Sequence, residues 1–360
     1  MAARYCQNRP MRSQRSRTRP TRNQGGLKMS AYTVPIAERL QHVSEAVAAS
    51  LDLWSISRPA KVTLINVSEN ATYLVEARDC RSIIRVHRPG YHSRKGIEQE
   101  LAWSMALSRD AVLVTPAPIP GLDGDFVQTL DSSVLPERRY MVMFEFVNGR
   151  QPDEREDLTG PFERLGAIAA RTHEHSQTWS APAPLERLIW DDAAVFGRRA
   201  TWGNWRDAPN VSREIRGTLE EAEKLVRARL NAFGKGRDRY GLIHADMRLA
   251  NLLIDGERTY LIDFDDCGLG WFLYDFAAAI SFMEDHPQVP ALRDAWVKGY
   301  RTVRSLSEIE EGEMDTFVML RRMALLAWIG SHIEAPEPQA MAPHFAAGTA
   351  ELAKRYLDKF

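Results

Sequence analysis

Acidic and amide side chains cluster in one stretch of the sequence, YGLIHADMRLANLLIDGERTYLIDFDDCG, which runs from Tyr240 to Gly268. The polar members of interest are Asp246, Asn251, Asp263, Asp265 and Asp266. They follow closely on two apolar runs, GLI and YLI, that are typical of buried strands. Because burying an unpaired carboxylate costs several kcal/mol or forces it to protonate, the sequence predicts a positive charge among these acids.

The spacing of these residues indicates a particular chemistry. HADMRLAN has the pattern H-x-D-x-x-x-x-N, and Asp263 follows twelve residues after Asn251, as in the catalytic loop and metal motif of kinases. A turn at residues 255–257 would let two strands bring Asp263 opposite Asn251. Asp246 could then accept the proton of a substrate hydroxyl, while Asn251 and Asp263 offer oxygens to Mg²⁺ on the phosphates of ATP. The alternative, an acidic hairpin on a solvated surface, explains neither the amide nor the spacing.

Phosphoryl transfer also needs a cation on the nucleotide phosphates and an acid that positions this cation. Arg85, in SIIRV, occupies the place of a strand lysine, although guanidinium is a bulkier, planar group. Glu98 and Glu100 both follow on a predicted helix. Glu100 is favoured, because it lies three and seven residues before Trp103 and Leu107 on the packed side of that helix.

The elements around these residues predict an α+β fold. Strand patterns cover residues 62–67, 71–75, 82–87, 126–130 and 140–146, with one helix at 96–107. From Pro161 onward the pattern is mostly helical. We therefore expect a small antiparallel β-sheet N-lobe that binds nucleotide at residues 31–147, and a mostly α-helical C-lobe with the catalytic and acceptor sites at 148–360. Turn residues at about 146–150 join them.

These motifs resemble those of the aminoglycoside phosphotransferase and choline kinase-like superfamily, which is related to protein kinases. The resemblance covers about residues 60–335 and includes HADMRLAN, IDFDD, YMVMFEFVNGR, LGAIAARTHEH and GWFLYDFAAAI. RVHRPGYHS and DFDDCGLGWFLYD are similar to the branch near homoserine kinase-like and stress-response kinase-like proteins. Two features depart from protein kinases: residues 68–71, SENA, replace a glycine-rich loop, and Asp265 replaces the glycine of D-F-G.

The resemblance implies a protein-kinase-like bilobal fold and assigns roles to individual residues. Asp246 would be the general base or orient the acceptor hydroxyl, with His244 as a buried brace and Asp275 as an acid that braces the loop. The implied magnesium ligands are Asn251 and Asp263, together with Asp265 unless Asp265 only hydrogen-bonds the loop. The implied nucleotide-binding residues are Arg85 and Glu100 for the phosphates, and Met143, Glu145 and Phe146 for adenine.

The acceptor is less clear from the sequence. The tryptophans and histidine that could line its site are Trp190, Trp202, Trp205, Trp271, Trp328 and His332. Aromatic residues at such spacing are commonly core residues, but in a cleft they could bind a cationic amine, helped by Asp191 and Asp192. We predict an ATP- and Mg²⁺-dependent phosphotransferase that acts on a hydroxyl of a small, amine-bearing metabolite. A Ser/Thr protein kinase of the stress-response type and a catalytically inactive nucleotide-binding regulator are the alternatives.

Composition limits the remaining possibilities. Residues 1–28 hold seven Arg, one Lys and no acid, which leaves 39 basic against 48 acidic residues, a net charge of −9, in the rest. We predict a disordered basic tail at 1–30: an extension upstream of a start at Met29, a basic arm, or a transit-type peptide.

No apolar run approaches the roughly 20 residues of a membrane span. Three scattered cysteines argue against disulfides or zinc. We expect a cytoplasmic protein whose folded part binds no nucleic acid.

Overall fold

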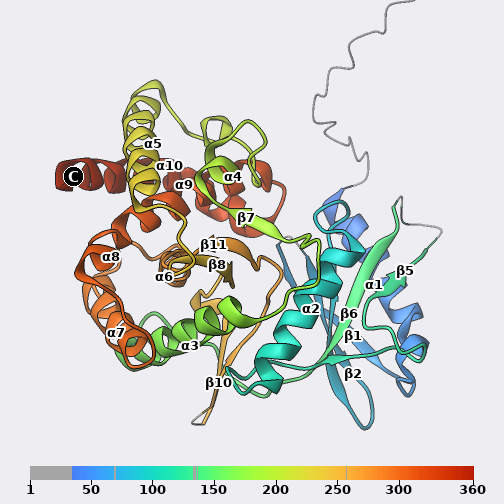
Figure 1. Cartoon of the computed structure of the whole chain (residues 1–360). Helices are drawn as coiled ribbons and strands as arrows, with labels where there is room; N and C mark the ends of the chain where they lie inside the picture. The colour runs from blue at the N-terminus through green and yellow to red at the C-terminus, as the bar shows by residue number, and fades with distance from the viewer. Residues whose placement is uncertain (1–34, 69, 133–134, 136, 257) are drawn as a thin grey trace, which may run out of the picture. The chain divides into compact units, whose positions relative to one another are not determined.

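The computed structural model describes residues 35–68, 70–132, 135, 137–256 and 258–360. Within residues 36–360, which form one compact unit, an antiparallel sheet with flanking helices precedes a mostly helical region (Figure 1). This order confirms the predicted α+β, protein-kinase-like fold. The tail predicted at residues 1–30 lies outside the described residues, and the lobe boundary at 147/148 stays a prediction.

Six strands form the first sheet, and all of their pairings are antiparallel. The path is β1–β2–β3–β6–β4, and β5 also pairs with β6. The strands are β1 (Lys61–Val67), β2 (Ala71–Glu76), β3 (Arg81–Val86), β4 (Pro118–Ile119), β5 (Gln128–Leu130) and β6 (Arg139–Glu145). Their β-branched and aromatic residues suit a pleated, half-buried surface. Five of them match the predicted strands to within two residues, and only the short β4 was not predicted.

Two helices cover opposite faces of this sheet, α1 (Ile36–Ala49) on one and α2 (Arg94–Arg109) on the other. Because side chains alternate along a strand, Met141 and Met143 join the core under α1, whereas Val142 and Phe144 pack on the α2 side. Arg85 is paired with Val142 in the ladder between β3 and β6. Its side chain therefore points to the face that α2 covers.

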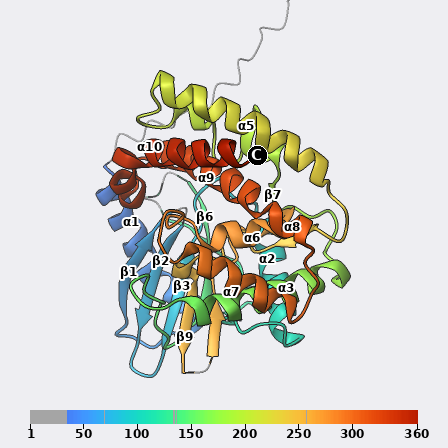
Figure 2. The same ribbon diagram turned by 90° about the vertical axis from the view of Figure 1, so that its left-hand side faces the viewer.

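The helical region is built around α9 (Met314–Ser331), a helix that is buried on nearly all sides. The other helices are α3 (Thr159–Thr178), α4 (Asp192–Phe196), α5 (Arg213–Phe233), α6 (Tyr274–Ala279), α7 (Val289–Arg301), α8 (Glu308–Gly312) and α10 (Pro336–Lys359), with short 3₁₀ turns η1 (Leu51–Trp54), η2 (Trp205–Asp207) and η3 (Leu249–Asn251). Figure 2 shows α10 running alongside α5 and α9. In the described part of the chain, no helix is long and apolar enough to cross a membrane.

Helices α3 and α7 cross at very close range because each presents a glycine to the other. A Cβ on Gly166 would lie 2.0 Å from the carbonyl oxygen of Trp296, and one on Gly299 would lie 1.8 Å from that of Glu163. Larger side chains would force the backbones apart. This contact fixes α3, and α3 in turn carries His173 toward the catalytic loop.

Two small sheets position the acidic stretch. The predicted hairpin forms between β9 (Leu252–Asp255) and β10 (Arg258–Leu261). Its register pairs Leu252 with Leu261, so Ile262 instead of Asp263 lies opposite Asn251. The second sheet contains β7 (Leu188–Trp190), β11 (Gly268–Trp271) and β8 (Tyr240–Ile243) in that order. It was not predicted in full, because β7 and β11 are short and carry little period-two alternation. Cys267, just before β11, is fully buried and acts as a packing residue.

Candidate active site

The loop after β8 is held by one buried carboxylate, Asp275. Its oxygens accept hydrogen bonds from the backbone amides of His244 (3.3 Å) and Ala245 (2.7 Å), and His173 Nε2 lies 2.9 Å away. Ala245 has a φ of +67°, a conformation that costs energy in a residue with a side chain. The structure thus places Asp275 where the resemblance put a bracing acid.

His244 lies at the centre of this loop and is fully buried. Its Nε2 is 3.2 Å from the carbonyl oxygen of Ile262, and its Nδ1 accepts the amide of Asp246 at 3.2 Å. Burial lowers the pKa of His244, so the ring is neutral. A neutral imidazole that joins two loops fits the predicted brace better than an acid–base group.

Asp246 lies between two arginines. Its Oδ1 is 2.6 Å from Arg321 Nη2, and its Oδ2 is 3.3 Å from Arg248 Nε and 2.7 Å from Asn251 Nδ2. Burial alone would raise the pKa of Asp246, but the two guanidinium groups and Asn251 lower it. The carboxylate is therefore ionised and oriented. The sequence analysis did not identify Arg321, although a charged pair within the apolar helix DTFVMLRRMALLAWIG was a signal.

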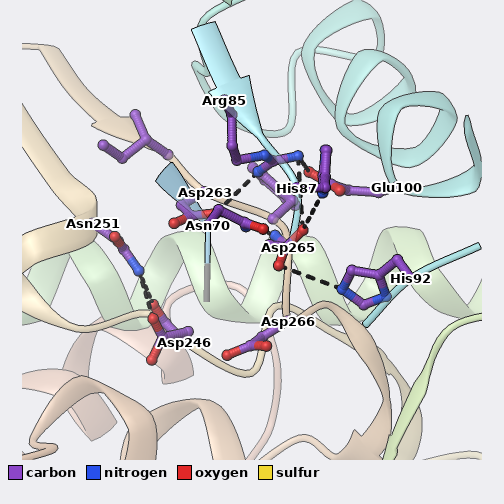
Figure 3. Close-up of polar contacts among 12 residues, drawn as sticks. Asn70, Arg85, His87, His92, Glu100, Asp246, Asn251, Asp263, Asp265 and Asp266 are labelled. Atoms are coloured by element: carbon purple, nitrogen blue, oxygen red, sulfur yellow. Dashed lines mark hydrogen bonds and ion pairs between the residues drawn. The ribbon is translucent and has the colours of Figure 1, made fainter. Parts of the chain in front are cut away.

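Arg85 forms the centre of a second cluster, shown in Figure 3. Its guanidinium lies 2.5 Å from Glu100 Oε1 and 3.0 Å from Asp263 Oδ1. Glu100 is only 1% exposed, whereas Glu98 pairs with Arg94 at the surface. The predicted preference for Glu100 over Glu98 agrees with this pairing, and the cation from the sheet does reach the acids of the C-terminal region.

Asn251 and Asp263 are suitable magnesium ligands. The amide nitrogen of Asn251 donates to Asp246, which leaves its oxygen facing away from that carboxylate, while the side chain of Asp263 is 42% exposed (Figure 3). Among the described residues, no group of three or more His, Cys, Asp or Glu could hold a metal. Mg²⁺, however, is commonly bound by one or two protein oxygens together with substrate phosphates and water. The all-oxygen pair therefore fits Mg²⁺ bound with a nucleotide.

The side chain of Asp265, which was also a predicted metal ligand, points toward two histidines. Its side chain is almost fully buried, with Oδ1 3.3 Å from His87 Nδ1 and Oδ2 3.4 Å from His92 Nε2. Burial raises the pKa of Asp265, but His92, His87 and Arg85 together hold it well below its usual range. Both oxygens face histidines of the segment after β3, and the assignment of Asp265 as a metal ligand stays a prediction. The arrangement favours the alternative, a carboxylate that holds two segments together.

The segment expected to bind adenine, residues 143–146, spans the end of β6. Met143 is fully buried in the core under α1, so its side chain points away from Arg85. Phe144, in the same segment, faces the site, with the Arg85 guanidinium 5.2 Å from its ring. The amide of Glu145 donates to the carbonyl oxygen of Ala117, and Arg81 lies 3.6 Å from the ring of Phe146. Strand pairing ends at Glu145, so the backbone of Phe146 lies beyond the ladder.

Most of the aromatic residues considered for the acceptor belong to the core. Trp190, Trp205 and Trp271 are fully buried, whereas the ring of Trp202 lies 5.1 Å from the guanidinium of Arg321, beside Asp246. The acids considered with them are paired elsewhere: the carboxylate of Asp191 with Lys235 (2.6 Å) and that of Asp192 with Arg227 (3.0 Å). These two acids are therefore not part of the site around Asp246.

The chain belongs to the phosphotransferase enzyme family (APH), whose sequence profile matches residues 61–311. This range contains the catalytic loop, the hairpin and the Arg85 cluster. The match confirms the predicted family. It also confirms the prediction of an enzyme, a kinase whose acceptor is a hydroxyl of a small molecule. The two alternatives, a Ser/Thr protein kinase and an inactive nucleotide-binding regulator, are therefore disfavoured. ATP as the phosphoryl donor follows from the family, whereas the cytoplasmic location stays a prediction.

Solved structures and curated relatives agree with this family. A microcompartment-associated aminopropanol kinase is 43% identical, with a TM-score of 0.80 over 89% of this chain and 98% of that chain. An amicoumacin kinase in complex with AMP-PNP and Ca²⁺ is 18% identical, with a TM-score of 0.70 over 86% of this chain and 96% of that chain. The amicoumacin kinase of Bacillus subtilis is 22% identical over 302 residues, 80% of this chain and 85% of that protein.

Proposed function

We propose that this protein transfers the γ-phosphoryl group of ATP, in a Mg²⁺-dependent reaction, to the hydroxyl of a small amino alcohol. The observation that carries the proposal is the 43% identity to an aminopropanol kinase over 98% of that chain. Such identity over a whole chain supports a related acceptor. The oriented carboxylate of Asp246 supports a hydroxyl as the attacking group.

Each residue of the two clusters has a distinct role in this proposal. Asn251 and Asp263 would hold Mg²⁺, which when bound neutralises charge on the phosphates. Arg85 binds phosphate oxygens, and Glu100 fixes the direction of its guanidinium. Asp246 orients the acceptor hydroxyl and accepts its proton, because its carboxylate is ionised and held by Arg321 and Asn251. Phosphoryl transfer depends mostly on positioning and charge, so a second base is unnecessary.

A substrate-dependent ADP-release assay tests the acceptor class. The panel contains 1-amino-2-propanol, ethanolamine, choline, homoserine, a neutral sugar, an aminoglycoside and a generic protein acceptor, each with ATP and Mg²⁺. We expect the small amino alcohols to give the highest kcat/KM. Turnover of the protein acceptor alone, or equal turnover of the sugar and the amino alcohols, would overturn the proposal.

A further inference from the structure

Arg187 is a buried arginine that the proposed mechanism does not use. It directly precedes β7 and is only 8% exposed. A buried guanidinium is costly unless its N–H groups find acceptors. Arg187 finds them in four backbone carbonyl oxygens, which belong to α2 and to the loop after Asp263. Its side chain therefore ties together the two elements that carry Glu100 and Asp263.

The segment 182–187, which ends in Arg187, is bound along the first turns of α2 (Figure 1). Gln99 of α2 binds three backbone groups of this segment: the carbonyl oxygens of Pro182 (3.0 Å) and Pro184 (2.8 Å) and the amide of Glu186 (2.6 Å). The approach is so close that a Cβ on Gly96 would lie 2.8 Å from the carbonyl oxygen of Glu186. Arg187 Nη1 donates to the carbonyl oxygen of Gly96 at 3.0 Å, about one helical turn before Glu100.

On the loop side, Arg187 binds the backbone that directly follows Asp263. Its Nε and Nη2 donate to the carbonyl oxygens of Cys267 (3.0 Å), Phe264 (3.4 Å) and Asp265. Asp263 itself has a φ of +62°, a conformation that costs energy and persists only where the surroundings fix it. The contacts of Arg187 are part of those surroundings, so they help to hold Asp263 in place.

Two arginines thus connect the same pair of elements. Arg85 bridges the side chains of Glu100 and Asp263 at 2.5 and 3.0 Å, and Arg187 bridges the backbones beside them. In the proposed reaction the contact between Arg85 and Asp263 must change, because Asp263 would bind Mg²⁺ and Arg85 would bind phosphate oxygens. The contacts of Arg187 involve only backbone carbonyls. They can therefore persist while those of Arg85 change.

We propose that Arg187 is a positioning residue, which keeps the loop of Asp263 in a fixed place relative to α2 while Arg85 exchanges Asp263 for the nucleotide. The inference rests on the proposed assignment of Asp263 as a magnesium ligand. It adds the residue that holds this ligand opposite the phosphate-binding pair of Arg85 and Glu100.

Calorimetric titration of ATP with and without Mg²⁺ tests this role in the wild type and in Arg187→Lys. Lysine keeps the positive charge, but its single ammonium group cannot span the carbonyls of α2 and of the loop. We expect the increase in ATP affinity that Mg²⁺ provides to fall about tenfold, as expected when hydrogen bonds of a charged group are lost. The affinity for ATP without Mg²⁺ and the KM for the acceptor should change less than threefold.

Arg322→Lys is the matched control, because Arg322 is similarly buried, at 6% exposure, but binds Glu284 and the carbonyl oxygen of Phe345. This variant should keep the full effect of Mg²⁺ on ATP affinity even where it lowers the thermal unfolding temperature. The comparison separates the positioning of the loop from a general loss of packing.

The outcomes distinguish this inference from the proposed function. Wild-type affinity for ATP that does not depend on Mg²⁺ overturns the proposed metal site as well. A full effect of Mg²⁺ in folded Arg187→Lys, or an equal loss in Arg322→Lys, overturns only the role of Arg187. Gln99→Ala covers the case in which Arg187→Lys does not fold: it loosens the segment 182–187 from α2 and should reduce the effect of Mg²⁺ a fewfold, and an unchanged effect counts against the inference.

Discussion

The two charged clusters of the site have opposite compositions. On the side of the sheet, one arginine, Arg85, faces the carboxylates of Glu100 and Asp263 at 2.5 and 3.0 Å. On the side of the helices, one carboxylate, Asp246, lies between Arg321 and Arg248 at 2.6 and 3.3 Å. The first cluster has an excess of negative charge, whereas the charges of the second are balanced, because Arg248 also pairs with Glu337 at 3.1 Å. The first can therefore accept a further cation, whereas the second has no need of one.

This difference gives two aspartates of neighbouring loops different properties. Although the side chain of Asp263 is 42% exposed, partial desolvation by the surrounding protein raises its pKa, and the nearby Asp265 and Glu100 act in the same direction against Arg85. The pKa of Asp246 is lowered because Arg248 and Arg321 outweigh its burial. A carboxylate surrounded by other acids gains most from a bound metal ion, while one surrounded by arginines stays ionised without it. The surroundings thus distinguish the proposed metal ligand from the proposed base.

Removing the negative charge of Asp263 should have the largest effect. Asp263→Asn keeps a residue that tolerates the φ of +62° at this position, but it removes a charged metal ligand. We expect Mg²⁺-dependent binding of ATP to be abolished and kcat/KM to fall by roughly 10³-fold or more, because metal and phosphate positioning supply most of the catalysis. Calorimetric titration of ATP with and without Mg²⁺ measures this directly.

Asp255→Asn provides the control for that experiment. Asp255 ends β9 in the same hairpin but is exposed, so its loss should change neither binding nor turnover. Metal-dependent ATP affinity that survives in Asp263→Asn would refute the assignment of Asp263 as a ligand.

Neutralising Asp246 should separate binding from chemistry. Asp246→Asn should keep ATP affinity within a fewfold and lower kcat by roughly 10²-fold or more, since the acceptor hydroxyl loses its proton acceptor. Because the buried guanidinium of Arg321 would then lose the carboxylate that it contacts at 2.6 Å, we also expect a loss of stability of about 1–3 kcal/mol. Single-turnover kinetics and thermal unfolding measure the two effects. Wild-type turnover in the folded variant would show that the base assignment is wrong.

The sequence predicted the parts of this site that depend on local spacing. HADMRLAN, IDFDD and the hairpin between them lie within one short stretch, and the Arg85–Glu100 pair follows from a strand and the next helix. It did not predict contacts between distant elements. Arg321 reaches Asp246 from a helix 75 residues away, and the histidines at Asp265 lie across 173 and 178 residues of chain. Such partners depend on how the elements pack, which no local pattern encodes.

The smallest effect should come from Arg321, the buried arginine that the sequence analysis missed. It contacts Asp246 Oδ1 through Nη2 and Ser281 Oγ through Nε (3.1 Å), so its planar group fixes the direction of the carboxylate. Arg321→Lys keeps the charge but cannot make both contacts. We expect kcat to fall about tenfold with the KM for ATP unchanged, because a misdirected base mainly weakens the transition state.

Arg322→Lys is the matched control for Arg321→Lys, since it changes the neighbouring residue of the same helix. Arg322 pairs with the buried Glu284 at 2.6 Å instead of Asp246. The control should therefore lower the thermal unfolding temperature while kcat stays near that of the wild type. If both variants lower kcat equally, Arg321 acts only through the packing of α9, and its contact with Asp246 has no role in orienting the acceptor.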